Sequence, residues 1–339
     1  MVKLDFDLER HVPELTGKVI LITGAKMLAS RNPAKIYITG RNEPAAQHVI
    51  ADIKSTGSNT EVAFIRCDHA DLASVKTAAN EISKESRLDI YGQRWYHGTP
   101  SWQRTKATTT KFETRKGLTK DGYELHFWIN HLAHALLIRM LLGLLQKTVK
   151  EHGEARIIPI SSLASVLAPR GHGIVFTDLK TTQAYCILGK WQRYAQSKLA
   201  NLLYGRELAR RYPEITTLIA DPGPSNTGLV SSLGFVDKTI VHLGNINRFL
   251  DEDQGHWNQV WTVGVPKAQA NQGELYEPVG KLSDGYTSSE VPQSSWLSFA
   301  SRIQRNIIPS IISNTTYTPL YTCISKSNQL IRTLQLVVL

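Results

Sequence analysis

Short apolar runs alternate along the chain with longer segments whose apolar residues recur at helical spacing. The apolar runs predict strands at 18–25, 35–41, 61–68, 88–90, 155–160, 215–220 and 273–280. The helical periodicity predicts helices at 43–57, 72–83, 127–145 and 192–211. Strands that alternate with helices build a parallel sheet with helices on both faces. We therefore expect an α/β fold, with one doubly wound, Rossmann-like domain over residues 1–283.

The helix predicted at 192–211 carries a pair of residues suited to proton transfer. Tyr194 and Lys198 are four residues apart, so their side chains lie on one face of the helix. A free phenol has a pKa near ~10, and an ammonium group about 4 Å away lowers that pKa by roughly three units at an effective dielectric near 20. We therefore expect Lys198 to lower the pKa of Tyr194. Taken alone, this spacing is more often a chance pairing on a helix surface, so its context decides.

Three further stretches complete an ordered set of polar residues. They are Asn130 in the preceding helix, Ser161-Ser162 at the tip of strand 155–160, and Asp221-Pro222-Gly223-Pro224-Ser225-Asn226-Thr227. The set resembles the short-chain dehydrogenase/reductase family, and most closely its fungal, retinol-dehydrogenase-like members. The resemblance covers roughly residues 15 to 90 and 117 to 283.

The resemblance implies interconversion of a carbonyl and an alcohol with a nicotinamide cofactor. It implies that Tyr194 gives its proton to the carbonyl oxygen and that Ser162, rather than Ser161, holds that oxygen. Lys198 is implied to bind the nicotinamide ribose as well as to act on Tyr194. Asn130 is implied to hold a water that connects Lys198 to solvent.

The first βαβ unit departs from the family pattern. Thr23 and Gly24 begin the expected glycine-rich turn, but Ala25-Lys26-Met27-Leu28-Ala29 follows and two of the three glycines are absent. Only ten residues, 25–34, separate Gly24 from the second strand. A parallel crossover needs at least about 10 to 12 residues, so we expect a truncated crossover with at most a stub of helix.

The second strand ends in Arg41, with no acidic residue to hold the ribose hydroxyl of NAD(H). An arginine there can pair with a 2′-phosphate, so we expect NADP(H) as the cofactor; a solvated arginine in a turn is the alternative. The family pattern also assigns cofactor contacts to Gly24, Asp68, Arg139, Gly223 and Thr227, beside Tyr194 and Lys198. Pro224 removes an N–H that the family uses on the carboxamide.

A second departure begins after the fourth strand. The family has Asn-Asn-Ala-Gly there, whereas this chain has an anomalous polar insert at about 91–116, and the tail 284–339 matches nothing in the family. We expect the tail to be irregular or disordered. One alternative is a relative that keeps the acid/base residues but binds cofactor poorly. Another is a sequence altered at exon boundaries, because the anomalies at 25–34, 91–116 and 284–339 begin abruptly.

Two stretches account for the formal net charge of +10. Residues 91–120 carry seven Lys or Arg against one acid, and residues 291–339 carry four against none. Neither stretch shows an ordered basic helix or interleaved aromatic residues, so nucleic-acid binding stays a minor hypothesis. A basic protein that binds acidic partners through 91–120 is the rival from another functional class.

Other features limit the setting and the partners. Three scattered cysteines favour a reducing, cytoplasmic location, and we expect no metal site, since His131 and His134 have no third ligand in register. We expect no membrane span. Residues 228–272, where Asp251 is expected to cap a helix with Trp257 and Trp261, suit a medium-sized hydrophobic substrate. The resemblance suggests fungal secondary metabolism, and pairing into a homodimer or homotetramer through the helices of Asn130 and Tyr194.

Overall fold

A computed structural model describes residues 4–22, 25–93, 117–169, 173–185, 189–224, 249–251, 254–283 and 308. The chain divides into two compact units, residues 1–296 and 297–339, and every element below belongs to the first. The strands are β1 (Val19–Leu21), β2 (Lys35–Gly40), β3 (Glu61–Arg66), β4 (Ile90–Gly92), β5 (Arg156–Ile158), β6 (Thr216–Thr217), β7 (Ile219–Ala220), β8 (Leu275–Glu277) and β9 (Lys281–Leu282). The α-helices are α1 (Leu8–His11), α2 (Ala25–Ala29), α3 (Glu43–Ser55), α4 (Leu72–Ile82), α5 (Leu125–Phe127), α6 (Ala133–His152), α7 (Gly189–Arg211) and α10 (Trp257–Gly264).

Six parallel strands form the central sheet in the order β3-β2-β1-β4-β5-β6. The order reverses between β1 and β4, which is the switch point at which doubly wound sheets bind ligands. Buried aliphatic residues from β1, β2, β4 and the end of β5 form one core with Val260 and Val263 of α10. The predicted Rossmann-like α/β class is confirmed.

The strand predicted at 215–220 is divided into β6 and β7. Thr216 pairs with Arg156, and four residues on, Ala220 pairs with Ile160 in the same register. Pro159 lies between the paired residues and has no N–H to donate to the ladder. Along its other edge, β7 pairs with β8 in parallel, and β8 pairs with β9 in antiparallel. The expectation of one uninterrupted strand was therefore wrong, because the proline interrupts the hydrogen bonds.

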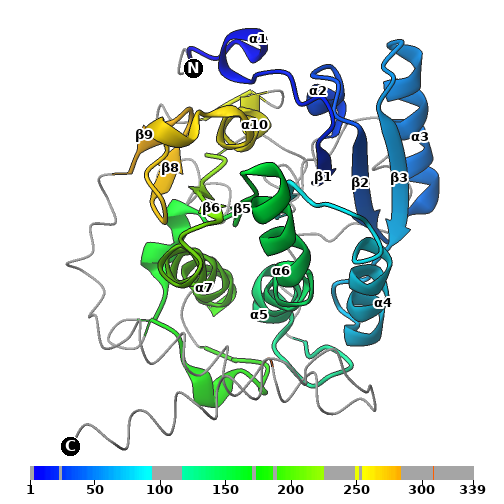
Figure 1. Ribbon diagram of the computed structural model, residues 1–339. Coiled ribbons are helices and arrows are strands. Elements are labelled where there is room, and N and C mark those ends of the chain that lie inside the picture. The colour runs from blue at the N-terminus through cyan, green and yellow to red at the C-terminus, as the bar shows by residue number, and fades with distance from the viewer. Residues whose placement is uncertain are drawn as a thin grey trace, which may run out of the picture. The chain divides into compact units, whose positions relative to one another are not determined.

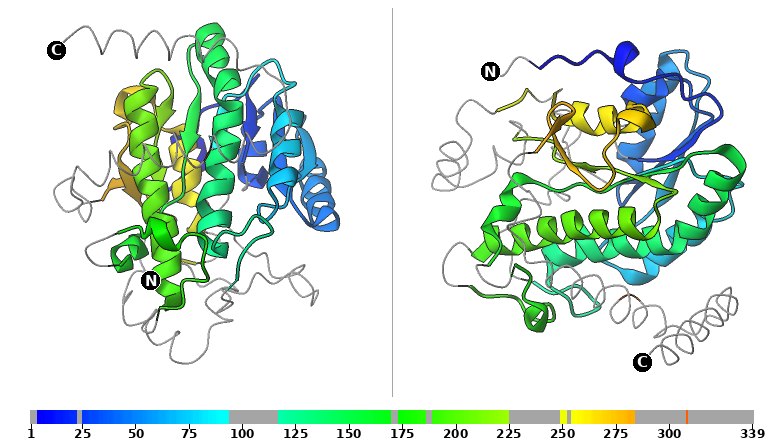
Figure 2. Two further views of the ribbon diagram at one scale, coloured as in Figure 1. Left: turned by 90° about the horizontal axis from the view of Figure 1, so that it is seen from below. Right: turned by 60° about the vertical axis from the view of Figure 1, so that its left-hand side comes forward.

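Helices cover both faces of the sheet. In Figure 1, α6 and α7 lie on one side of the strands with α4, while α2, α3 and α10 lie on the other. Both views in Figure 2 show α6 and α7 side by side along the same face. Helix α7 sits close to β7, since a Cβ on Gly205 would meet the Ile219 side chain at 2.6 Å. A larger residue at 205 would push the Tyr194 helix off the sheet.

The first crossover is short, as predicted. Its helix α2 has five residues, and Leu28 and Ala29 are buried in the core. The next two helices begin where side-chain caps are available. Asn42 accepts a hydrogen bond from the N–H of Ala45, and Asp71 accepts from Ala73 at the start of α4. These caps confirm the helices predicted at 43–57 and 72–83.

Asp251 does not cap the tryptophan helix, contrary to expectation. A 3₁₀ turn, Gln254–His256, precedes α10, and His256 is the residue at the cap position. Asp251 instead donates its N–H to the side chain of Gln254 at 3.1 Å. Trp261 packs against Tyr276 of β8, as expected for a core residue.

A turn of π-helix, Trp128–Leu132, joins α5 to α6. The helical stretch Leu125–His152 is the one segment among the described residues that is long and apolar enough to cross a membrane, which the sequence analysis did not anticipate. About two thirds of its most apolar window (67%) is buried inside the fold, as in a core helix. His131 and His134 are buried there, bonded to Asn201 and to Tyr91.

Burial of His131 predicts a loss of stability in acid. Burial lowers the pKa of His131 from 6.5 to about 4, against the hydrogen bond that its Nδ1 donates to the side-chain oxygen of Asn201. As the pH falls from about 6.5 to 4, His131 binds a proton in the unfolded chain but not in the folded chain. The free energy of unfolding therefore falls by about 3 kcal/mol. In urea titrations across this range, His131→Asn should lose about 3 kcal/mol less than the wild type. The exposed control His152→Asn should keep the wild-type slope, and an equal slope for His131→Asn would contradict the account.

Candidate active site

The predicted catalytic side chains meet at the carboxyl end of the sheet. Ser162 follows β5, Asp221 follows β7, and Tyr194 and Lys198 face them from α7. Ser162 is extended (φ −164°, ψ 147°) and begins the 3₁₀ turn Leu163–Leu167, and its Oγ accepts a hydrogen bond from the N–H of Ala164 at 3.2 Å. Ser162 is thus fixed at the strand tip by its own turn.

The two neighbouring serines face different groups. Ser162 hydrogen-bonds to the Tyr194 phenol. Ser161 is fully buried, and its Oγ donates to the main-chain carbonyl of Lys198 at 3.0 Å. The structure therefore brings Ser162, and not Ser161, to the phenol.

Lys198 lies against the ring of Tyr194. Its Nζ is 5.7 Å from the ring centroid and donates to the carbonyl of Ile160 at 3.2 Å. Burial raises the pKa of Tyr194 well above 10; Asp221 adds to the rise, and the Ser162 hydrogen bond opposes it. The expectation that Lys198 lowers the Tyr194 pKa is therefore wrong: burial sets the direction, and the pKa rises. Burial also lowers the pKa of Lys198 itself to about 8, against the charge of Asp221.

Asp221 is a buried carboxylate beside this pair. Burial raises its pKa to about 6, while hydrogen bonds from the N–H groups of Gly223 and Leu163 lower it. Those bonds measure 2.8 Å and 2.9 Å. Gly223 has a φ of +76°, and a Cβ there would meet Pro278 at 2.8 Å, so the turn requires glycine.

Asn130 lies in the π-turn, half-buried, and ties that turn to α7. Its side-chain amide donates to the Oγ of Ser197 at 3.0 Å. Its main-chain carbonyl accepts from the side chains of Gln93 and Asn201. π-turns inside α-helices are frequent at functional sites. These contacts give Asn130 a positional part in the site, and the expected water relay through it remains a prediction.

A buried ion pair joins α7 to the start of the Asn130 helix. Arg193 and Glu124 are 2% and 0% exposed, with 3.5 Å between Nε and Oε1. Glu124 also accepts the N–H of Phe127, and Arg193 donates to the carbonyl of Gln183 at 3.1 Å. Gln196 accepts the N–H of Val175 and donates to the side chain of Gln183. Residues on both sides of Tyr194 thus hold the segment 173–185 against α7.

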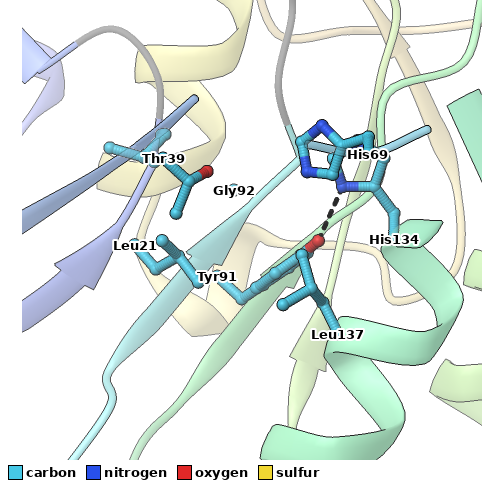
Figure 3. Close-up of a pocket in the computed structure, with 8 residues that line it drawn as sticks. Leu21, Thr39, His69, Tyr91, Gly92, His134 and Leu137 are labelled. Atoms are coloured by element: carbon cyan, nitrogen blue, oxygen red, sulfur yellow. Dashed lines mark hydrogen bonds between the residues drawn. The ribbon is translucent and has the colours of Figure 1, made fainter. Parts of the chain in front are cut away.

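A small pocket opens at the switch point between β1 and β4 (Figure 3). It is lined by Leu21, Ile22, Thr39, His69, Tyr91, Gly92, His134 and Leu137. Tyr91 and His134 are joined by a hydrogen bond of 2.8 Å, and the His69 ring lies 4.5 Å from that of His134. The pocket is therefore lined by the rings of Tyr91, His69 and His134, with Leu137 beside them and Leu21 and Thr39 opposite.

The remaining predicted cofactor residues are spread along the same edge. Arg41 and Asp68 follow β2 and β3, with 3.9 Å between Nη1 and Oδ1 and side chains 45% and 39% exposed. Arg139 lies on α6 and is partly buried. Gly24 and Thr227 fall outside the described residues, as do most of the insert, the tail after Ser283 except residue 308, and residues 225–248.

These residues suit the nicotinamide end and the adenosine end of a dinucleotide. The hydroxyl, phenol and ammonium groups at Ser162, Tyr194 and Lys198 suit a nicotinamide ribose and a reacting oxygen. Exposed Arg41 suits a phosphate at the adenosine end. Between them, α2 is only five residues long, so this part of the chain offers no full-length helix N-terminus to a pyrophosphate.

The sequence analysis missed Asn201, Gln93 and the functional contacts of Asp221. Asn201 donates to the carbonyls of Ile160 and Asn130. Its helical spacing from Tyr194 and Lys198 places it on the same face, and that signal was available. Gln93 connects Ile160 to Asn130 from the first residue after β4, where the sequence pattern departs from the family and gave no signal.

Known proteins resemble this chain. A fission-yeast (Schizosaccharomyces pombe) protein described as an uncharacterized oxidoreductase is 35% identical over 231 residues, which cover 64% of this chain and 63% of that protein. A short-chain dehydrogenase/reductase of Armillaria gallica is 29% identical over 283 residues, covering 80% and 84%. Mouse retinol dehydrogenase 12 is 31% identical over 222 residues, covering 62% of each chain. The relatives support a general oxidoreductase role.

Solved structures share the fold. An uncharacterized protein from Mycobacterium paratuberculosis superposes with a TM-score of 0.59 at 20% identity, covering 87% of this chain and 96% of that one. A short-chain dehydrogenase/reductase mutant from Serratia marcescens gives a TM-score of 0.50 at 22% identity, covering 79% and 98%. No protein-family model matches the chain.

Arg193→Met should strongly destabilise the protein. It would leave Glu124 buried without its cation, and removing one partner of a buried ion pair costs about 3–5 kcal/mol. The measurement is the free energy of unfolding in urea at neutral pH. The double variant Glu124→Gln/Arg193→Met should recover part of the loss, because no charge is then buried. A loss below about 1 kcal/mol in the single variant would show that the pair does not hold these helices together.

Proposed function

The chain belongs to the short-chain dehydrogenase/reductase family, and from this premise we propose that it interconverts a carbonyl and an alcohol on a medium-sized hydrophobic substrate with NADP(H). The observation that carries the proposal is the hydrogen bond between Ser162 and Tyr194, with the ammonium of Lys198 beside the phenol ring. A reduced nicotinamide, when bound, supplies hydride to the carbonyl carbon.

The proton chemistry falls to Tyr194. The phenol is protonated at neutral pH, so it can donate a proton to the substrate oxygen. Ser162 is placed to donate a second hydrogen bond to that oxygen, where negative charge develops as hydride arrives. The site would thus stabilise an alkoxide and protonate it from the same side.

Lys198 and Arg41 would hold the cofactor. Lys198 remains protonated below a pKa of about 8, and one of its three donors is engaged by the carbonyl of Ile160. The Lys198 ammonium group is suited to ribose hydroxyls. Exposed Arg41 would pair with a 2′-phosphate, which supports NADP(H) over NAD(H). Gly24, Asp68, Arg139, Gly223 and Thr227 are the further cofactor contacts that we propose from the family pattern.

A hydrophobic substrate agrees with the kind of relative found. One relative is described as a retinol dehydrogenase. Another, human polyprenol dehydrogenase, is 27% identical over 279 residues. Beside the proposed oxygen site, Val166 and Leu167 of the 3₁₀ turn that Ser162 begins are 65% and 41% exposed. We propose a cytoplasmic enzyme of fungal secondary metabolism, in which no metal takes part and two or four copies pair.

The short helix α2 favours a second candidate, a relative that keeps the site but binds the cofactor poorly. A five-residue helix supplies little of the dipole and few of the free N–H groups that hold a pyrophosphate. Titration of the full chain with NADPH, followed by nicotinamide fluorescence, separates the two. Saturable binding supports the enzyme, and no saturable signal at millimolar NADPH supports the impaired relative.

Tyr194→Phe should abolish most turnover while leaving the fold intact. Loss of a general acid costs roughly 10²–10⁴-fold in rate. The assay is oxidation of NADPH with a panel of apolar ketones and aldehydes. Tyr212→Phe is the control: it removes a hydroxyl just after the last residue of the same helix, at the end away from Tyr194, and should retain the wild-type rate. Wild-type turnover in Tyr194→Phe would refute the assignment of the proton donor.

Arg41→Ala should weaken NADPH binding and leave NADH binding unchanged. Hydrogen bonds to a charged group are worth about 1.5–3 kcal/mol, so the Kd for NADPH should rise roughly 10- to 150-fold. Lys54→Ala, an exposed lysine in the last turn of α3, is the matched control for loss of a positive charge. If the wild type binds NADPH and NADH equally well, the proposed preference for NADP(H) is wrong.

A further inference from the structure

Asp221 is a buried ionisable group that the proposed mechanism does not use. It is 4% exposed and follows β7 at the carboxyl end of the sheet. Its main chain is held on both sides: its N–H donates to the carbonyl of Tyr276, and its carbonyl accepts from the side chain of Asn258 at 2.6 Å. The backbone therefore fixes the carboxylate in place.

Both carboxylate oxygens of Asp221 accept hydrogen bonds from main-chain N–H groups, one in the turn after Ser162 and one in the turn at Gly223. Oδ2 accepts the N–H of Leu163, the residue after Ser162, at 2.9 Å. Oδ1 accepts the N–H of Gly223 at 2.8 Å, which closes the turn at positive φ. One side chain thus links the Ser162 turn to the turn that the family pattern assigns to the cofactor.

The charge of Asp221 acts on the two groups that face it from α7. When ionised, it raises the pKa of Tyr194 and the pKa of Lys198, because a negative charge favours the protonated form of each. From β8, Glu277 faces Asp221 and raises its pKa by repulsion. Among the described residues, the 3₁₀ turn beside it and Asn258 of α10 bring no charge.

We propose that Asp221 is a positioning residue of the site, whose carboxylate ties the turn after Ser162 to the turn at Gly223 and whose negative charge favours the ammonium form of Lys198. This inference rests on the proposed function. Below the pKa of Asp221, about 6, the carboxylate loses its charge and this support is withdrawn.

The direct test measures Lys198 in the full chain without substrate or cofactor. Lysine side chains are labelled with ¹³C, the Lys198 resonance is identified by its loss in Lys198→Met, and its titration is followed by NMR. The wild type should titrate with a pKa near 8. Asp221→Asn should lower that pKa, since an opposite charge nearby has been removed. The surface variant Glu151→Gln should leave it in place.

A purely structural role predicts a different result. Asp221→Asn would then lower the thermal midpoint and leave the Lys198 pKa unchanged, which would overturn the proposed role of the charge. Because the titration needs no turnover, this failure is distinct from failure of the proposed function, which Tyr194→Phe tests. In the reductase assay, the high-pH decline in rate should also move to lower pH in Asp221→Asn.

Glu277→Gln tests the same idea without disturbing the bonds of Asp221. The Glu277 carboxylate accepts a hydrogen bond from the hydroxyl of Ser283, and Asp221 takes its own hydrogen bonds from Leu163 and Gly223. Removing its charge should lower the Asp221 pKa below about 6, read from the ¹³C resonance of its carboxylate. This variant keeps the proposal testable if Asp221→Asn does not fold. An unchanged Asp221 pKa in Glu277→Gln would show that the carboxylate does not sense its charged neighbours, and would contradict the proposal.

Discussion

The main-chain carbonyl of Ile160 holds the Tyr194 helix to the end of the sheet. It accepts hydrogen bonds from the Nζ of Lys198 at 3.2 Å and from the amide of Asn201 at 2.9 Å. The N–H of the same residue is held by Gln93. Because Gln93 and Asn201 also hold the carbonyl of Asn130, the strand tip, the π-turn and α7 share one hydrogen-bond network. The placement of Tyr194 opposite Ser162 depends on it.

Burial gives this network its chemical consequence. The low local dielectric disfavours charge, so it raises the pKa of Tyr194 and of Asp221 and lowers the pKa of Lys198 to about 8. Between about pH 6 and pH 8, Asp221 and Lys198 are both ionised while the phenol keeps its proton. The opposite charges of Asp221 and Lys198 thus stabilise each other, while the neighbouring Tyr194 phenol is neutral. Neighbouring groups whose pKa values are shifted in opposite directions are typical of sites that transfer protons.

The sequence predicted the order of elements and the pairing of Tyr194 with Lys198 on one helix face because both leave local patterns. Strand periodicity and helical spacing gave β1 to β5 and α7, and the Tyr194/Lys198 spacing required only one helix. The prediction that Lys198 lowers the Tyr194 pKa was opposite to the direction seen, because it counted the charge and left out burial. The division of strand 215–220 depends on its pairing with Pro159 and β8, which lie elsewhere in the chain. The start of α10 depends on the hydrogen bond between Asp251 and Gln254. Hydrophobic periodicity reveals neither contact.

A crystal structure of the full chain with NADPH and a bound apolar ketone tests the central claim most directly. The account predicts the ketone oxygen within hydrogen-bond distance of both the Tyr194 hydroxyl and the Ser162 Oγ, with the ammonium of Lys198 on the ribose hydroxyls. A ketone oxygen that contacts neither hydroxyl, in a complex with NADPH bound at the carboxyl end of the sheet, would contradict it.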